Sequence, residues 1–166
     1  MNQNKLIETL RESRFLHDID AAHLERIAHI AGIREFEPHD VVFREGQPAE
    51  HVYLVASGKV SLQIGAARTG CKQIVTVGPG EMLGWSTLTD HPNFAATGTA
   101  VERTTMIQID GRRLRAICDS DPPFGYEFTR RTMLALAKRL TATWTQLAEL
   151  DLAHSMPVTV AAAQNE

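Results

Sequence analysis

The stretch FREGQPAEHVYLVASGKVSL, Phe43 to Leu62, is the part of this sequence that decides the fold. Its second half is rich in β-branched and aromatic residues on both sides of Ser57-Gly58, which is typical of two short strands joined by a tight turn. Its first half holds the turn residues Glu45-Gly46-Gln47-Pro48. The stretch therefore predicts a turn, a strand, a second turn and a second strand.

Similar short strands lie on either side of it. The segments IREFE, VVF, KQIVTV and TTMIQI have strand-like composition, and glycine- or proline-containing turns separate them. Strands this short, interrupted this often, exclude a parallel sheet with helical crossovers. Residues 33–110 are therefore expected to form an antiparallel β-roll of the jelly-roll kind.

Helical periodicity flanks this predicted roll. Residues 1–32 are expected to be N-terminal helices, with Asp20 as an N-cap and Gly32 ending the last helix. Residues 111–153 are expected to be C-terminal helices, with Asp110 as a cap and a long helix from about Phe124. Residues 154–166 have no amphipathic pattern and are expected to be disordered. The predicted fold class is α+β.

Bulk composition narrows the function classes. The chain has 166 residues and a net charge of −3, which fits one domain and argues against an overall electrostatic footprint for nucleic acid. Two cysteines make no disulfide framework, and neither a leader nor a membrane-length apolar run is evident, so a cytoplasmic protein is expected. The seven histidines are scattered, and neither a metal nor another cofactor is expected.

The stretch at 43–62 resembles a known family. It matches the pattern F-x-x-G-x-x-x-x-x-x-Y-x-[VI]-x-x-G-x-[VA] of cyclic-nucleotide-binding domains, the fold of the catabolite activator and of cAMP-dependent kinase regulatory subunits. The resemblance places Gly46 and Gly58 at tight turns that need a positive φ. It also places Phe43, Tyr53 and Val60 inside the roll.

The family resemblance implies a phosphate-binding cassette in the segment 80–100, GEMLGWSTLTDHPNFAATGTA. In the family a glutamate binds the ribose 2′-hydroxyl, an arginine binds the cyclic phosphate, and backbone N–H groups complete the site. Aligning MLGWSTL and FAATGTA with that pattern puts Trp85 in the place of the glutamate and Phe94 in the place of the arginine. Using Glu81 as the glutamate leaves no arginine at a workable spacing. The candidate ligand-binding residues are Leu83, Gly84, Trp85, Ser86, Thr87, Phe94, Ala95, Ala96 and Thr97.

The two aromatic replacements argue against tight binding of cAMP or cGMP. Losing a guanidinium–phosphate pair should weaken binding by roughly a hundredfold or more. Phe94 would also place an apolar ring beside an anion. Three interpretations remain open: the rings pack into the roll and close the cavity, they form an aromatic floor for a less charged ligand, or a nucleotide binds through unorthodox contacts.

The remaining patterns bear on partners. Apolar residues of the long helix recur at three and four positions and predict a homodimer joined along 124–153; they are Met133, Leu136, Leu140, Trp144 and Leu147. The basic stretch at 103–139 is interpreted as a solvated surface, and no helix-turn-helix pattern follows Glu149, so direct DNA binding is not expected.

No catalytic motif is present. The sequence favours a non-enzymatic regulatory module that acts through protein contacts or an atypical ligand. Two alternatives are a nucleotide receptor with unorthodox contacts and a part of a catabolite-activator-like transcription regulator.

Overall fold

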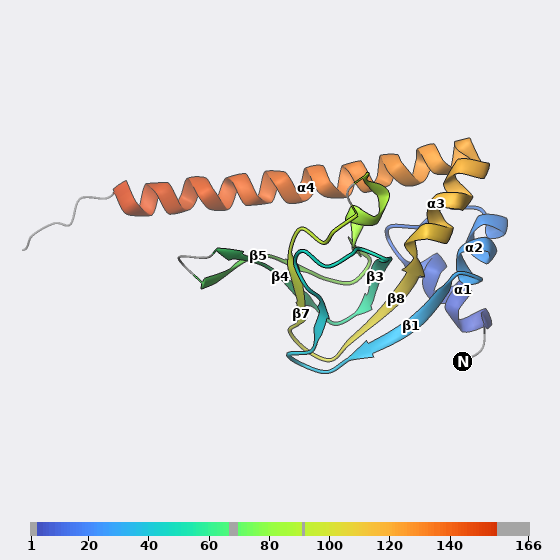
Figure 1. The fold of residues 1–166 in the computed structure, drawn as a ribbon, viewed down its shortest axis with the longest axis horizontal. Coiled ribbons are helices and arrows are strands. Elements are labelled where there is room, and N and C mark those ends of the chain that lie inside the picture. Colours follow the sequence, from blue (N-terminus) through green and yellow to red (C-terminus); the bar gives the residue numbers. More distant parts are fainter. Residues whose placement is uncertain (1–2, 67–69, 91, 156–166) are drawn as a thin grey trace, which may run out of the picture.

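The computed structural model describes residues 3–66, 70–90 and 92–155, and it confirms an antiparallel β-roll between helices (Figure 1). The helices are α1 (Gln3–Glu12), α2 (Ala21–Ala28), α3 (Gly111–Ser120) and α4 (Pro122–Ser155), with a short 3₁₀ helix η1 (Trp85–Leu88). The strands are β1 (Ala31–Phe36), β2 (Val41–Phe43), β3 (His51–Ser57), β4 (Val60–Ala66), β5 (Gly70–Val77), β6 (Met82–Leu83), β7 (Thr97–Ala100) and β8 (Thr104–Asp110).

Two four-stranded antiparallel sheets make up the described part of the roll. One has the strand order β1-β8-β3-β6 and the other the order β2-β7-β4-β5. The turn predicted at Ser57-Gly58 joins β3 to β4, which lie in different sheets. Gly46 and Gly58 have the predicted positive φ values, 79° and 84°.

Side chains alternate between the two faces of the sheet β1-β8-β3-β6, so each face of this sheet contributes to a separate hydrophobic core. In β3, Val52 and Leu54 face one side while Tyr53 and Val55 face the other, because successive side chains of a strand point in opposite directions. A strand that is buried on both faces has a nearly continuous run of apolar residues in its sequence, as the segment HVYLV of β3 does.

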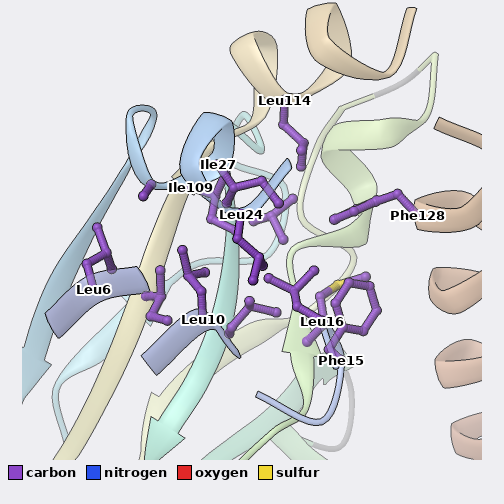
Figure 2. Close-up of a cluster of buried hydrophobic side chains, with 14 of the residues drawn as sticks. Leu6, Leu10, Phe15, Leu16, Leu24, Ile27, Ile109, Leu114 and Phe128 are labelled. Atoms are coloured by element: carbon purple, nitrogen blue, oxygen red, sulfur yellow. The ribbon is translucent and has the colours of Figure 1, made fainter. Parts of the chain in front are cut away.

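The first core lies between this sheet and the helices, and we call it the helical core. Figure 2 shows its side chains converging from the N-terminal helices, β8, α3 and the start of α4. Leu10, Leu16, Ile27, Leu114 and Phe128 are fully buried there. The second core fills the roll between its sheets, and we call it the roll core. It consists of Phe43, Ala49, Tyr53, Val55, Val60, Val77, Leu83, Phe94 and Met106.

The predicted end of the N-terminal helices was wrong. Helix α2 ends at Ala28 with His29 as its C-cap, and both Ala31 and Gly32 belong to β1. Gly32 pairs with Gln108 of β8, so strand pairing overrides the local helix-ending signal of a glycine. The caps themselves are correct, because the carboxylate of Asp20 accepts a hydrogen bond from the His23 amide.

Helix α4 is longer than expected at both ends. It begins at Pro122, since proline is tolerated in the first turn of a helix, and it runs to Ser155. The first two residues of the segment expected to be disordered, at 154 and 155, are therefore helical. The rest of that segment, 156–166, lies outside the described residues. In Figure 1 α4 runs along the roll and extends beyond it.

Candidate functional site

The cassette-like segment starts from a tight turn. The Glu81 amide donates to the Gly78 carbonyl, and the Gly78 amide donates to Glu81 Oε2 at 2.9 Å. The Glu81 carboxylate is thus used to close its own turn, and it lies 4.0 Å from the ammonium of Lys138. Glu81 therefore has a structural role in this turn.

Gly84 starts η1 in the left-handed conformation, with φ 78°. A Cβ at this position would lie 2.4 Å from the carbonyl oxygen of His51, so no other residue fits without moving β3. The glycine that the resemblance aligns at position 84 is therefore required by the backbone at that point.

The two aromatic replacements pack against different cores. Phe94 is 7% exposed, and its ring stacks on Phe43 with centroids 4.2 Å apart and planes 15° apart. It is a member of the roll core. Trp85 is half-buried and packs against the helical core. The rings are thus held by two separate sets of neighbours.

A small cavity lies between the two ends of the segment. Its volume is about 40 Å³, well below the roughly 300–1,000 Å³ of a typical small-molecule site. Of the nine candidate ligand-binding residues, seven line it: Leu83, Gly84, Trp85, Ser86, Phe94, Ala95 and Ala96. Sequence analysis missed three further lining residues, Phe43, Leu62 and Arg139.

The two remaining candidates point elsewhere. Thr87 is buried, and its hydroxyl donates to the Gly84 carbonyl at 3.0 Å, which closes the turn of η1. The Thr97 hydroxyl accepts a hydrogen bond from the Glu45 amide at 3.0 Å. Both threonines are therefore engaged in holding the backbone.

Arg139 brings a positive charge to the cavity from α4. Its guanidinium donates to the carbonyl of Met82, at the start of the cassette-like segment. Burial lowers the pKa of Arg139 from its ordinary value, and the Glu81 carboxylate acts in the opposite direction. The cassette-like segment has no arginine or lysine of its own. Helix α4, which is distant in sequence, thus supplies a positive charge to the cavity.

A larger cavity of about 500 Å³ lies beside η1, against Thr87 and the start of α3. Its charged walls carry both signs, with Arg112 and Arg115 opposite Glu50 and Asp110. The Arg115 guanidinium donates to the carbonyls of Thr87 and Thr89 and so ties η1 to α3.

Many cations of the basic stretch at 103–139 have acidic partners. Arg103 lies 3.2 Å from Glu35, and Arg130 and Arg131 lie 2.8 and 2.7 Å from Glu127. The side-chain hydrogen bonds from Arg130 and then Arg131 lower the pKa of Glu127 to about 2. The Arg130 pair lies on the partly exposed surface of α4, Arg131 is mostly buried, and the Arg103 pair joins the loop before β8 to β1.

The part of the chain that the structure describes has neither a metal-binding cluster nor a membrane-spanning helix. Within 3–66, 70–90 and 92–155, no three His, Cys, Asp or Glu side chains are grouped so that they could hold a metal ion. In the same ranges, no helix has the length and apolar character needed to cross a bilayer.

Comparison with known proteins identifies the family. The model of the cyclic nucleotide-binding domain matches residues 33–121. The CRP-like cAMP-activated global transcriptional regulator of Mycobacterium tuberculosis is 30% identical over 118 residues, which are 70% of this chain and 50% of the regulator. The chain spans about half the length of that relative.

Solved structures share the fold. A cyclic nucleotide-binding domain from Methylobacillus flagellatus superposes with a TM-score of 0.73 at 16% identity, covering 95% of this chain and 86% of that one. A mutant regulatory subunit of a cAMP-independent protein kinase A from Trypanosoma brucei gives 0.61 at 24% identity, covering 66% and 40%.

Proposed function

Since this chain belongs to the cyclic nucleotide-binding domain family, we propose that it is a non-enzymatic regulatory module that does not bind cAMP or cGMP tightly and acts through protein contacts along α4. The observation that carries this proposal is the cavity of about 40 Å³ at the cassette-like segment. Pockets that bind small molecules such as a cyclic nucleotide usually measure about 300–1,000 Å³.

Chemistry at the cavity supports the same conclusion. The resemblance aligns Phe94 with the family's phosphate-binding arginine, and the Phe94 side chain, stacked on Phe43, has no hydrogen-bond donor to offer at that position. A cyclic phosphate entering the cavity would lose its hydration without a compensating partner at that position. Trp85 offers one N–H donor where the family's carboxylate would accept a hydrogen bond from the ribose 2′-hydroxyl.

The exposed face of α4 supports a role in assembly. Met133, Leu140, Trp144 and Leu147 are 60%, 49%, 60% and 50% exposed, although all four are large and apolar. They recur at spacings of seven, four and three residues, which is the heptad spacing of a coiled-coil seam. A second copy of this chain, paired along α4, would bury them.

Calorimetry with cAMP and cGMP tests the first part of the proposal. The parent should give no measurable binding at about 100 µM nucleotide, an affinity weaker than about −5 kcal/mol. The double variant Trp85→Glu/Phe94→Arg, which restores both family side chains, should bind at least about a hundredfold more tightly. Phe94→Leu is the matched control, because it removes the ring without adding a cation, and it should gain nothing.

A solved relative makes this restoration reasonable. The Trypanosoma brucei protein, a cAMP-independent kinase subunit, has been solved bound to cAMP with three substitutions, one of which introduces an arginine. Low-micromolar binding of cAMP by the parent chain would contradict the proposal.

One observation favours a second candidate function, a nucleotide receptor with unorthodox contacts. The Arg139 guanidinium lines the cavity and is held only by the Met82 carbonyl among the hydrogen bonds that the described residues show. An outward movement of α4 would let this cation meet a phosphate in place of the missing arginine. In that case the parent binds cAMP in calorimetry and Arg139→Gln does not.

A further inference from the structure

Asp121, the C-cap of α3, has a carboxylate that contacts both α2 and α4 at the elbow between α3 and α4. Its Oδ1 accepts a hydrogen bond from the Phe124 amide at 3.3 Å, in the first turn of α4. Its Oδ2 accepts from Nε2 of His23 at 2.8 Å and from Arg26 at 3.1 Å, both on α2. The direction in which α4 leaves α3 is therefore tied to the N-terminal helices.

His23 is the centre of this cluster. While Nε2 faces Asp121, Nδ1 faces the carboxylate of Asp20, the N-cap of α2. The imidazole lies flat on the ring of Phe124, with centroids 4.6 Å apart and planes 8° apart. A neutral imidazole has one N–H and one lone pair, so only the protonated ring can donate to both carboxylates.

We propose that His23 is a proton-operated latch that fastens α2 to the α3–α4 elbow and so sets the position of α4. When the ring carries two protons, it bridges Asp20 and Asp121. When it loses one, a lone pair faces one of the two carboxylates, and that contact breaks. The inference does not depend on whether α4 pairs with a second copy.

The pKa shifts agree with this geometry. The hydrogen bond to Asp121, then that to Asp20, raises the pKa of His23 above its ordinary value of 6.5, against the opposing effect of burial. Hydrogen bonds from His23 lower the pKa values of Asp121 and Asp20. Because the His23 pKa is raised on folding, its stabilisation is complete below 6.5 and is lost as the pH rises through the folded value. The carboxylates contribute above their ordinary value of 3.8 and lose that contribution as the pH falls through their lowered values.

Other groups at the elbow determine how far the latch opens. Arg26 pairs with Asp121 and donates to the Ser120 hydroxyl at 3.1 Å, so α2 keeps one ion pair when His23 is neutral. The Cys118 thiol, whose pKa burial raises to about 11, is neutral through the same range, and the nearby Asp119 carboxylate adds to that rise. Among these groups, His23 is the one whose ordinary pKa lies nearest neutral pH, and its contacts raise that pKa further.

Release of His23 would act on the first turns of α4. Phe124, on which the imidazole lies, contacts Phe128 in the helical core, with centroids 5.9 Å apart. Loosening the α2 contact should raise the frequency with which this turn opens, without unfolding the roll.

Two measurements on the full chain test the latch. In NMR titrations, the His23 ring should titrate above 6.5, the value of an unperturbed histidine. Hydrogen exchange, corrected for the intrinsic pH dependence, should show several-fold less protection at residues 118–128 at pH 8.5 than at pH 6. His23→Gln, which cannot take up the proton, should show the same protection at both pH values.

A second variant guards against a simple folding defect in His23→Gln. Asp121→Asn keeps a side-chain acceptor for the Phe124 amide but removes the charge, so the His23 titration should move to lower pH. His17→Gln is the matched control, since His17 is exposed and pairs with Asp18 outside the elbow. It should behave like the parent. A His23 titration at or below 6.5, or protection at 118–128 equal at both pH values in the parent, would overturn the proposal.

Discussion

The two parts of α4 differ in what holds them. In residues 122–132, Phe124 and Phe128 are 4% and 0% exposed and belong to the helical core. From Met133 onward, Met133, Leu134, Leu140, Trp144 and Leu147 are 49% to 60% exposed, whereas Leu136 is half-buried. The helix is therefore anchored in the core at its beginning, and most of the large apolar side chains described beyond residue 132 are exposed.

Polar contacts hold α4 to the body of the molecule beyond Phe128. Arg131 donates to the carbonyls of Phe15 and His17, at 2.9 and 2.6 Å, and Arg139 donates to the carbonyl of Met82. Hydrogen bonds of this kind contribute less than a buried aromatic side chain and can exchange with water. Three substitutions test this division.

Phe128→Ala should have the largest effect. Removing a fully buried ring leaves a cavity in the helical core, and the free energy of unfolding should fall by about 3–5 kcal/mol. Urea denaturation followed by circular dichroism measures this change. Met133→Ala, five residues along the same helix but 60% exposed, should change it by no more than about 0.5 kcal/mol. Equal losses in the two variants would erase the proposed difference between the two parts.

Leu140→Asp should have a smaller effect on folding and a clear effect on assembly. A carboxylate on the apolar face would be desolvated in a paired seam, which should weaken dimerisation by at least about tenfold. Sedimentation equilibrium of parent and variant measures it. Thr141→Asp adds the same charge at an exposed position beside the seam, and it should leave the mass unchanged. A parent that is already monomeric at high concentration would remove α4 from any self-assembly.

Arg139→Gln should have the smallest effect. Its guanidinium makes one hydrogen bond to a carbonyl and is partly exposed, so the free energy of unfolding should fall by about 1 kcal/mol. Lys138→Gln, which lies in the adjacent position and only approaches Glu81, is the control and should be neutral within about 0.5 kcal/mol. A loss above about 3 kcal/mol would show that Arg139 anchors α4 as strongly as the core does.

Local signals in the sequence predicted much of this fold. The Asp20 and Asp110 caps follow from short-range patterns, because an N-cap depends on a few neighbouring residues. The positive φ of Gly46 and Gly58 and the packing of Phe43 inside the roll follow from the family resemblance of residues 43–62. The resemblance also supplied the candidate ligand-binding residues; seven of them line the small cavity, and their role in binding stays a prediction.

Features that depend on tertiary contacts could not be found from the sequence. Gly32 resembles a helix end until β8 pairs with it. Lys138 and Arg139 are adjacent on a helix that carries charged residues on several sides. No local sequence pattern shows which of these side chains points toward Met82. The separate packing of Trp85 and Phe94 likewise follows from the two faces of the first sheet, which only the fold defines.

Gly84, the N-cap of η1, bears on how domains of this family are recognised in sequence surveys. Because the oxygen of His51 lies 2.4 Å from where a Cβ would stand, Gly84 is demanded by the neighbouring strand whether or not anything enters the cavity. A survey that scores this glycine therefore selects domains by backbone shape and carries no information on what they bind. We propose that ligand preference is better judged at the positions that align with Trp85 and Phe94 of this chain.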